Sequence, residues 1–155
     1  MGRLLNFSDA SNFAIHALIL LARAPRGTRL SSAELAATLE VSEAHLGKVL
    51  QRLAHLGFVD SRRGPHGGFV LKRDPAAVTL YDILTAIDGP LDAGVCALGR
   101  PLCIGRTCAL GCVLQKVHAI VHDHFAGTRL SDLMDRDLHE RAPDVQGVGP
   151  VPRQP

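Results

Sequence analysis

The stretch SEAHLGKVLQRLAHLGFVDSRRGPHGGFVL, residues 42–71, decides the fold of this 155-residue chain. From Glu43 to about Leu56 its apolar residues recur at i, i+3, i+4 and i+7, the pattern of a helix with one buried side. These apolar residues are Leu46, Val49, Leu50, Leu53 and Leu56. The opposite side is polar and basic, and Gly57 is expected to end the helix. The first half therefore predicts an amphipathic helix with an open basic side.

The second half of the stretch predicts a β-hairpin. Two short strands are expected at 58–63 and 68–73, and the residues between them, RGPHGG at 63–68, have the glycines and proline of a tight turn. The basic side chains of this hairpin are Arg62, Arg63, His66, Lys72 and Arg73. A basic hairpin directly after a helix pair is typical of a wing, which holds phosphates or enters the minor groove of DNA.

The residues before 42 predict the other half of a helix-turn-helix. Ser31 and Glu34 form a capping box that opens a short helix, and Val41 and Ser42 make a tight turn into the next one. In this arrangement the second helix enters the DNA major groove. A plain pair of amphipathic helices with a solvated face would show the same pattern, but the wing favours DNA binding.

Candidate DNA-contacting residues lie on the open side of the second helix and on the hairpin. Lys48 and Arg63 are the strongest candidates, because long cationic side chains reach base edges and phosphates. The full predicted set is Ser42, His45, Lys48, Gln51, Arg52, Arg62, Arg63, His66 and Gly67.

A further helix is predicted on each side of this unit. The first covers residues 8–24, and His16 within it is expected to be a core or interface histidine. The other follows the wing, with Thr79 and Asp82 as its capping pair and Gly89 after its end.

A long helix is predicted late in the chain, from near Cys108 to about Phe125. An apolar stripe runs along it, made of Leu110, Val113, Leu114, Val117, Ile120, Val121, His124 and Phe125. Such a stripe favours packing against a second copy of the chain, and packing against the chain's own domain is the alternative. A short helical piece at 128–138 follows.

The expected fold is mainly α with a small β-hairpin. Its parts are a winged helix-turn-helix domain over 1–90, a cysteine-rich loop over 91–112, dimerisation helices over 108–141 and a disordered tail over 142–155.

All four cysteines lie in one loop, VCALGRPLCIGRTCALGC at 95–112. It has no CxxC pair, which structural zinc sites commonly use, and its glycines and proline let the backbone fold around a ligand. Arg100 and Arg106 favour thiolates. The loop thus predicts an iron–sulfur cluster, with Cys96, Cys103, Cys108 and Cys112 as ligands. Four unrelated cysteines, a zinc knuckle and two disulfides are the alternatives.

Composition limits the class of protein. With 46% hydrophobic residues the chain is one globular domain, and a net charge of +2 does not by itself mark a nucleic-acid binder. The start lacks a secretory pattern and the longest apolar run, 13–22, is too short to span a bilayer, so the cytoplasm is expected. Thiols stay reduced there, which favours metal over disulfides. No enzyme motif such as HExxH is present.

With these parts in place, the chain resembles the Rrf family of winged-helix transcriptional regulators, of the IscR, NsrR and RirA type. The resemblance covers residues 4 to about 138. It is carried by FSDASNFAIHALILLA, the stretch 42–71, VTLYDILTAIDGPL, the loop cysteines, CALG and TRLSDL, and RGPHGGFVLKRDP is its most specific part. The resemblance implies homodimers that bind palindromic promoter sites. It also implies a 2Fe-2S or 4Fe-4S cluster, with Cys96, Cys103 and Cys108 matching the family's cluster cysteines.

The family's fourth cluster ligand differs among members, being a histidine after the third cysteine or an acidic residue of the partner's first helix. The matching first-helix position here is Asn12, a poor ligand, with Asp9 and His16 one turn to either side. Cys112 is an addition to the family pattern, and on a helix beginning near Cys108 the two would lie at i and i+4. We expect Cys112 first, Asp9 or His16 of the partner subunit second, and an open iron site third.

The leading prediction is a homodimeric regulator of transcription that binds double-stranded DNA. It would sense redox state, nitric oxide, or iron or cluster supply through its cluster. A winged-helix regulator with thiol-based or zinc-based sensing is the first alternative. An iron–sulfur carrier or electron-transfer module is the second, and it would leave the wing unexplained.

Overall fold

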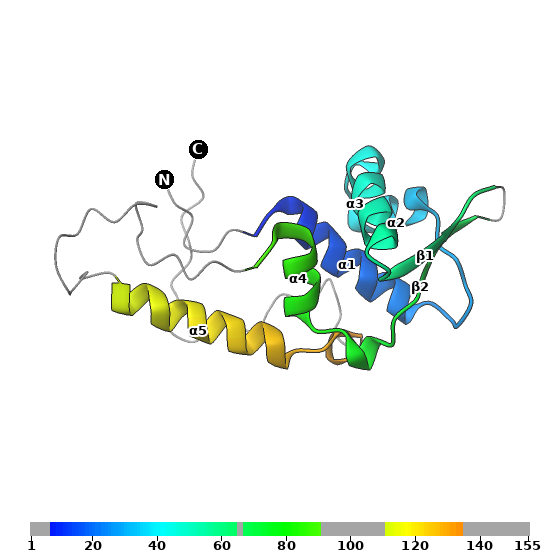
Figure 1. Ribbon diagram of the computed structural model, residues 1–155. Helices are drawn as coiled ribbons and strands as arrows, with labels where there is room; N and C mark the ends of the chain where they lie inside the picture. The colour runs from blue at the N-terminus through cyan, green and yellow to red at the C-terminus, as the bar shows by residue number, and fades with distance from the viewer. Residues whose placement is uncertain (1–6, 65–66, 91–110, 135–155) are drawn as a thin grey trace.

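The computed structural model describes residues 7–64, 67–90 and 111–134. This part is mainly helical with one antiparallel hairpin, which confirms the predicted fold class (Figure 1). Its elements in order are α1 (Asp9–Arg23), α2 (Ser32–Leu39), α3 (Glu43–His55), β1 (Val59–Arg62), β2 (Gly68–Leu71), the 3-10 helix η1 (Pro75–Ala77), α4 (Leu80–Asp88), α5 (Gly111–Gly127) and the 3-10 helix η2 (Leu130–Leu133).

Helix α1 is the centre of the core. It contacts α2, α3, α4, β2 and η2, and its Ala14, Ala17 and Leu18 have no solvent exposure. The small alanines let neighbouring helices approach closely, and the Ser8 hydroxyl caps the helix by accepting from the Ser11 amide. Because α3 and α4 both pack on α1, the helix pair α2–α3 and the helix after the wing share one core.

The helix pair α2–α3 has the predicted capping box. The Ser31 hydroxyl accepts from the Glu34 amide at 3.1 Å, and the Glu34 carboxylate accepts from the Ser31 amide at 2.7 Å. The turn begins at Glu40, which has a left-handed φ of 54°. Leu56 differs from its predicted burial: it lies past the end of α3 as the cap residue and is 36% exposed.

The wing strands pair antiparallel from Val59 opposite Leu71 to Arg62 opposite Gly68. They are shorter than predicted, because the outer residues leave the ladder. Leu30, before α2, adds an isolated bridge to Phe69, with hydrogen bonds of 3.0 and 2.8 Å. This bridge ties β2 to the segment just before α2.

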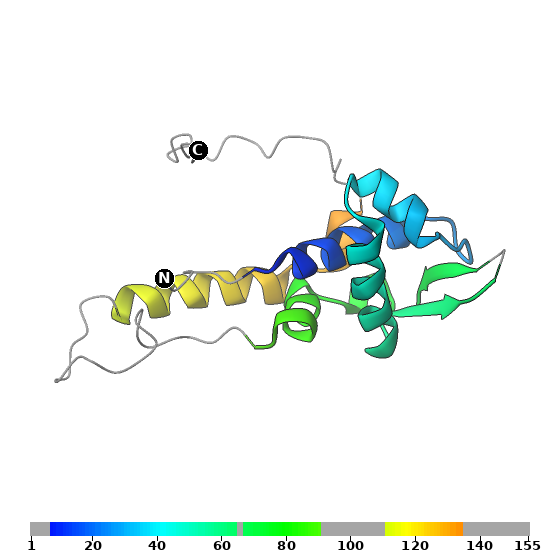
Figure 2. The same cartoon turned by 90° about the horizontal axis from the view of Figure 1, so that it is seen from above.

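Helix α5 extends from the body on the side away from the wing (Figures 1 and 2). Its inner side packs on α4, where the rings of Tyr81 and His122 meet edge to face at 4.6 Å. After α5 the chain returns to the core, since Leu130 is fully buried and Arg129 bridges to Thr79. On its outer side Val113 and Ile120 are 55% and 70% exposed, as an uncovered apolar stripe.

Candidate nucleic-acid interface

Helix α3 presents the predicted polar side to solvent. Leu46, Leu50 and Leu53 have no exposure and fix the opposite side against the core, while Lys48 and Gln51 are exposed. Ser42 and His45 are also exposed, at and near the start of the helix. In a helix-turn-helix this end of the second helix reaches the base edges.

Arg52 has a second role that the sequence did not indicate. Its Nη2 donates to the Ala86 carbonyl of α4 at 3.1 Å, so the guanidinium is directed toward α4. Arg52 remains exposed, but part of its hydrogen-bonding capacity joins α3 to α4.

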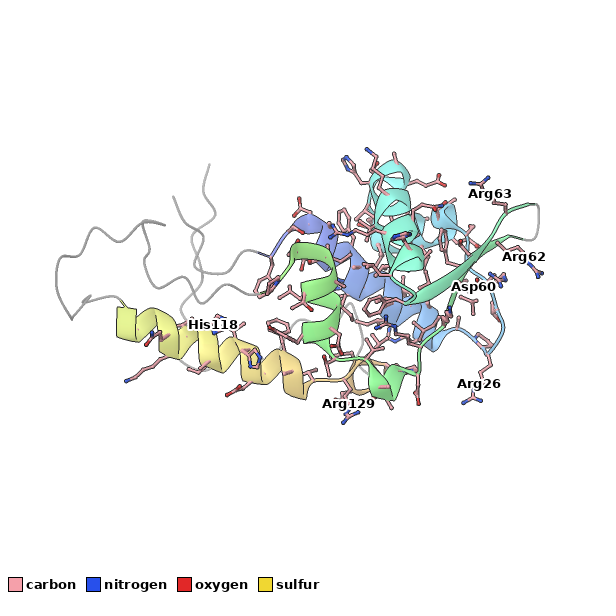
Figure 3. All side chains as sticks on the ribbon, in the orientation of Figure 1. Arg26, Asp60, Arg62, Arg63, His118 and Arg129 are labelled. Carbon is pink, nitrogen blue, oxygen red and sulfur yellow. The ribbon has the colours of Figure 1, made fainter. Side chains whose placement is uncertain are left out.

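Arg62 and Arg63 lie along the hairpin beyond Asp60, and both are exposed (Figure 3). The fold itself explains the glycine at position 67, because a Cβ there would lie 2.3 Å from the Arg62 carbonyl oxygen. His66, which was also predicted to contact DNA, lies outside the described residues. The structure thus places two of the predicted wing cations on an accessible strand end.

Arg29 is a positioning residue that the sequence did not single out. Its Nη2 lies 2.7 Å from the Asp60 carboxylate, and its Nη1 donates to the Gly68 carbonyl at 3.2 Å. One guanidinium therefore joins the two strands of the wing, at Asp60 of β1 and at Gly68, the first residue of β2. The hydrogen bond from Arg29 lowers the pKa of Asp60, with smaller help from nearby Lys72 and Arg62.

A second arginine braces the wing from the other side. Arg73 donates to the carbonyls of Leu56 and Gly57, at 2.8 and 3.2 Å. Its guanidinium carbon also lies 3.9 Å from the centre of the buried Phe58 ring, a cation–π contact. The guanidinium of Arg73, which was predicted as a wing cation, thus makes contacts that stabilise the fold.

The end of α4 is bonded to the start of α1. Asp88 accepts from the Ser8 amide at 3.0 Å, the Ser8 hydroxyl at 2.5 Å and the Ser11 hydroxyl at 2.7 Å. Partial burial would raise the pKa of Asp88, but these bonds and the nearby Arg52 charge hold it below its ordinary value. In sequence, the predicted cysteine loop begins three residues later, at residue 91.

Only one of the four predicted cysteine ligands lies in the part of the chain that the structure describes. Cys96, Cys103 and Cys108 lie outside the described residues, and Cys112 lies in the first turn of α5. Among the residues that are described, no three His, Cys, Asp or Glu side chains form a metal-binding group. None of the helices described there is long and apolar enough to cross a membrane.

The alternative ligands on α1 are accessible. Asp9 and His16 are exposed, and His16 Nδ1 lies 2.8 Å from the Asn12 carbonyl oxygen. His16 is therefore a surface residue of this subunit, as an interface histidine would be before its partner is added. Both side chains face away from the core that α1 shares with α3 and α4.

Comparison with known proteins agrees with this geometry. A family model described as "Rrf2: Iron-dependent Transcriptional regulator" matches residues 7–136. The chain is 30% identical over 116 residues to the HTH-type transcriptional regulator NsrR of Bacillus subtilis, covering 74% of this chain and 77% of that protein.

Two solved structures are similar in fold. CymR, the global cysteine regulator of B. subtilis, is 26% identical with a TM-score of 0.70, over 84% of this chain and 96% of that one. T. potens IscR is 22% identical with a TM-score of 0.67, over 90% of this chain and 93% of that one.

Proposed function

Because the chain belongs to the Rrf2 family of DNA-binding transcriptional regulators, we propose that it works as a homodimer on a palindromic promoter site and senses its signal through an iron–sulfur cluster. The observation that carries the proposal is the pairing of an exposed polar α3 face with an accessible basic wing. Both α3 and the wing pack on α1, so they would meet the same stretch of duplex.

Lys48 and Arg63 would make the main electrostatic contacts. Lys48 is exposed on α3, from which it would reach the major groove, and Arg63 directly follows β1, where it would reach phosphates or the minor groove. Neither side chain has a hydrogen bond or ion pair within the described part of the chain. Each is therefore free to bind DNA without breaking a contact that supports the fold.

The test is a gel-shift titration with promoter DNA at several salt concentrations. The Lys48→Ala/Arg63→Ala double variant should bind at least 10-fold more weakly and lose about two from the slope of log K against log salt. Gln115→Ala, on a side of α5 away from Val113 and Ile120, is the control and should bind as the wild type does. Equal affinity for the double variant and the control would exclude this surface.

The uncovered stripe on α5 supports the homodimer. An isoleucine with 70% of its surface in water is costly unless another surface covers it, and Val113 lies two turns away on the same side. Val117 lies between them and is half-buried. A two-fold contact along α5 would set the two α3 helices on half-sites about 34 Å apart or a multiple of it.

The four cysteines and the family's iron dependence support the cluster. Thiolates are the usual protein ligands of iron–sulfur clusters, and a bound cluster would tie the end of α4 to the start of α5. The residues of this chain that would carry the effect onward are Asp88, bonded to α1, and Ala86, bonded to Arg52 of α3. DNA affinity would then depend on the cluster.

Anaerobic purification with absorbance, iron and sulfide determination tests the cluster directly. Cys103→Ala should lose iron and change specific DNA binding while keeping its helical content. Cys112→Ala separates the fourth-ligand choices, because a stable cluster in this variant would favour Asp9 or His16 of the partner subunit. A colourless protein with bound zinc, or none, would instead favour sensing by the thiols themselves. Equal DNA affinity with and without the cluster, at matched salt, would exclude the switching mechanism.

A further inference from the structure

Gly47 lies inside α3, where glycine is unfavourable. A glycine in a helix interior destabilises the protein relative to alanine, because it loses more backbone freedom on folding and brings no side chain. Gly47 is helical and is followed by eight more helical residues of the same element. Its presence therefore needs a reason that outweighs a stability cost.

Other glycines of the described chain have such a reason within the fold. Positive φ angles occur at Gly27, Gly57, Gly64, Gly68 and Gly89. An added Cβ at Gly67 or Gly68 would lie 2.3 or 2.7 Å from a backbone oxygen. Gly127 is the last residue of α5, where helices tolerate glycine.

Gly47 has none of these reasons. Its φ is not positive, and a Cβ built on it would have no heavy atom within 4 Å outside its immediate helix. The space beside it is open. The fold itself would accept alanine or a larger residue here, so nothing within the subunit accounts for the glycine and its cause is to be sought outside the subunit.

The position of Gly47 indicates what that is. It precedes the exposed Lys48 and lies one helical turn before the exposed Gln51, in the N-terminal half of the helix that would enter the major groove. A residue without a side chain lets a base-pair edge come close to the helix backbone. A side chain at 47 would hold the groove away from α3 and lift Gln51 from its base.

We propose that Gly47 is a specificity-determining residue, at which the bare backbone of α3 contacts base-pair edges of the operator. This inference rests on the proposed DNA binding and deepens it. It assigns to Gly47 the selection among sequences, whereas Lys48 and Arg63 supply attraction for any duplex.

The experiment compares Gly47→Ala and Gly47→Leu with the wild type and with Gly127→Ala. The probe is a duplex that the wild type selects from a random-sequence pool, and a scrambled duplex of equal length measures non-specific binding. Gly47→Ala should raise Tm by about 3 °C, because it removes the helix penalty. It should also lower affinity for the selected duplex by about 10-fold, and Gly47→Leu by more, with the scrambled duplex unaffected. Gly127→Ala should bind both duplexes as the wild type does.

The outcomes separate this inference from the proposed function. Wild-type affinity for the selected duplex in Gly47→Leu would overturn the role of Gly47 and leave DNA binding intact. An equal loss on both duplexes would also overturn it, because the change would then act on general attraction. A wild-type protein that selects no sequence would remove the proposed function and this inference together. Circular dichroism of each variant confirms that α3 is still helical.

Discussion

At the scale of the residue, Glu40 marks the turn between α2 and α3. Its left-handed backbone lets its amide and that of Val41 bond to carbonyls of the last turn of α2, at 3.3 and 3.0 Å. Glycine adopts this conformation without the steric cost that glutamate bears. Glu40 thus holds a left-handed backbone conformation that is strained for a residue with a side chain.

Glu40→Gly should therefore stabilise the protein, because relief of the left-handed strain contributes roughly 1 kcal/mol to the free energy of unfolding. The greater backbone freedom of glycine in the unfolded chain offsets part of this gain. Urea denaturation, as a shift of the midpoint at constant m, measures the change. Glu40→Ala removes the same charge but keeps the strained φ, and it should give no gain. Equal stabilisation by both variants would mean that charge, not backbone conformation, is responsible.

Asp88 gives the fold an acid-sensitive contact. Its pKa lies below the ordinary 3.8 when folded, so its bonds to Ser8 and Ser11 stabilise the protein above that pH and are lost as pH falls through the lowered value. From about pH 5 to about pH 3 the Tm of the wild type should fall more steeply than that of Asp88→Asn. Glu34 and Asp60, whose pKa values are also lowered, remain in both proteins and cancel in the comparison. Parallel Tm profiles would contradict this role.

At the scale of the element, the wing is held by residues outside it. Arg29 contacts Asp60 and the Gly68 carbonyl, so its loss should loosen both strands together. Arg29→Ala should increase amide hydrogen exchange in β2 and lower DNA affinity by about 3-fold to 10-fold, with little change in the helices. Arg26→Ala removes a nearby exposed arginine and is the control for exchange. Unchanged exchange in β2 of Arg29→Ala would show that the strand ladder alone holds the wing.

The elements themselves were predictable where their causes are local. Both capping boxes join residues three apart, so Ser31 with Glu34 and Thr79 with Asp82 could be recognised from spacing. The contacts that place the site join distant residues. Arg29 and Asp60 are 31 residues apart, and no periodicity links them.

The same reasoning explains the two differences around α3. Arg52 was predicted to contact DNA because it lies on the polar face opposite the apolar stripe, and this stays a prediction. Its hydrogen bond to the Ala86 carbonyl, 34 residues away, is a contact that the helix pattern does not indicate. Leu56 continues the apolar spacing past the point where the helix stops, so the pattern overstated its burial. The ligand positions Cys96, Cys103 and Cys108 stay predictions.

At the scale of the whole molecule, the expected assembly is a dimer along α5. Ile120→Asp places a charge where an apolar side chain would meet the partner, so sedimentation should show monomers and affinity for a full palindrome should fall by at least 10-fold. Affinity for a single half-site should change little. Gln115→Asp, exposed on another side of the same helix, should remain dimeric. A wild type that sediments as a monomer even when bound to DNA would exclude this interface.

The return of the chain to the core after α5 makes the winged unit discontinuous in sequence. Leu130 fills the core, its amide donates to the Val78 carbonyl at 2.8 Å, and Arg23 of α1 donates to the carbonyls of Leu133 and Met134. A fragment that ends after the wing would have a cavity in place of Leu130 and a Val78 carbonyl without its hydrogen bond. Helix α5, which would join two subunits, is thus attached to the core at its C-terminal end by the residues that follow it. A shift of α5 relative to a partner subunit would therefore be passed to the core through residues 128–134.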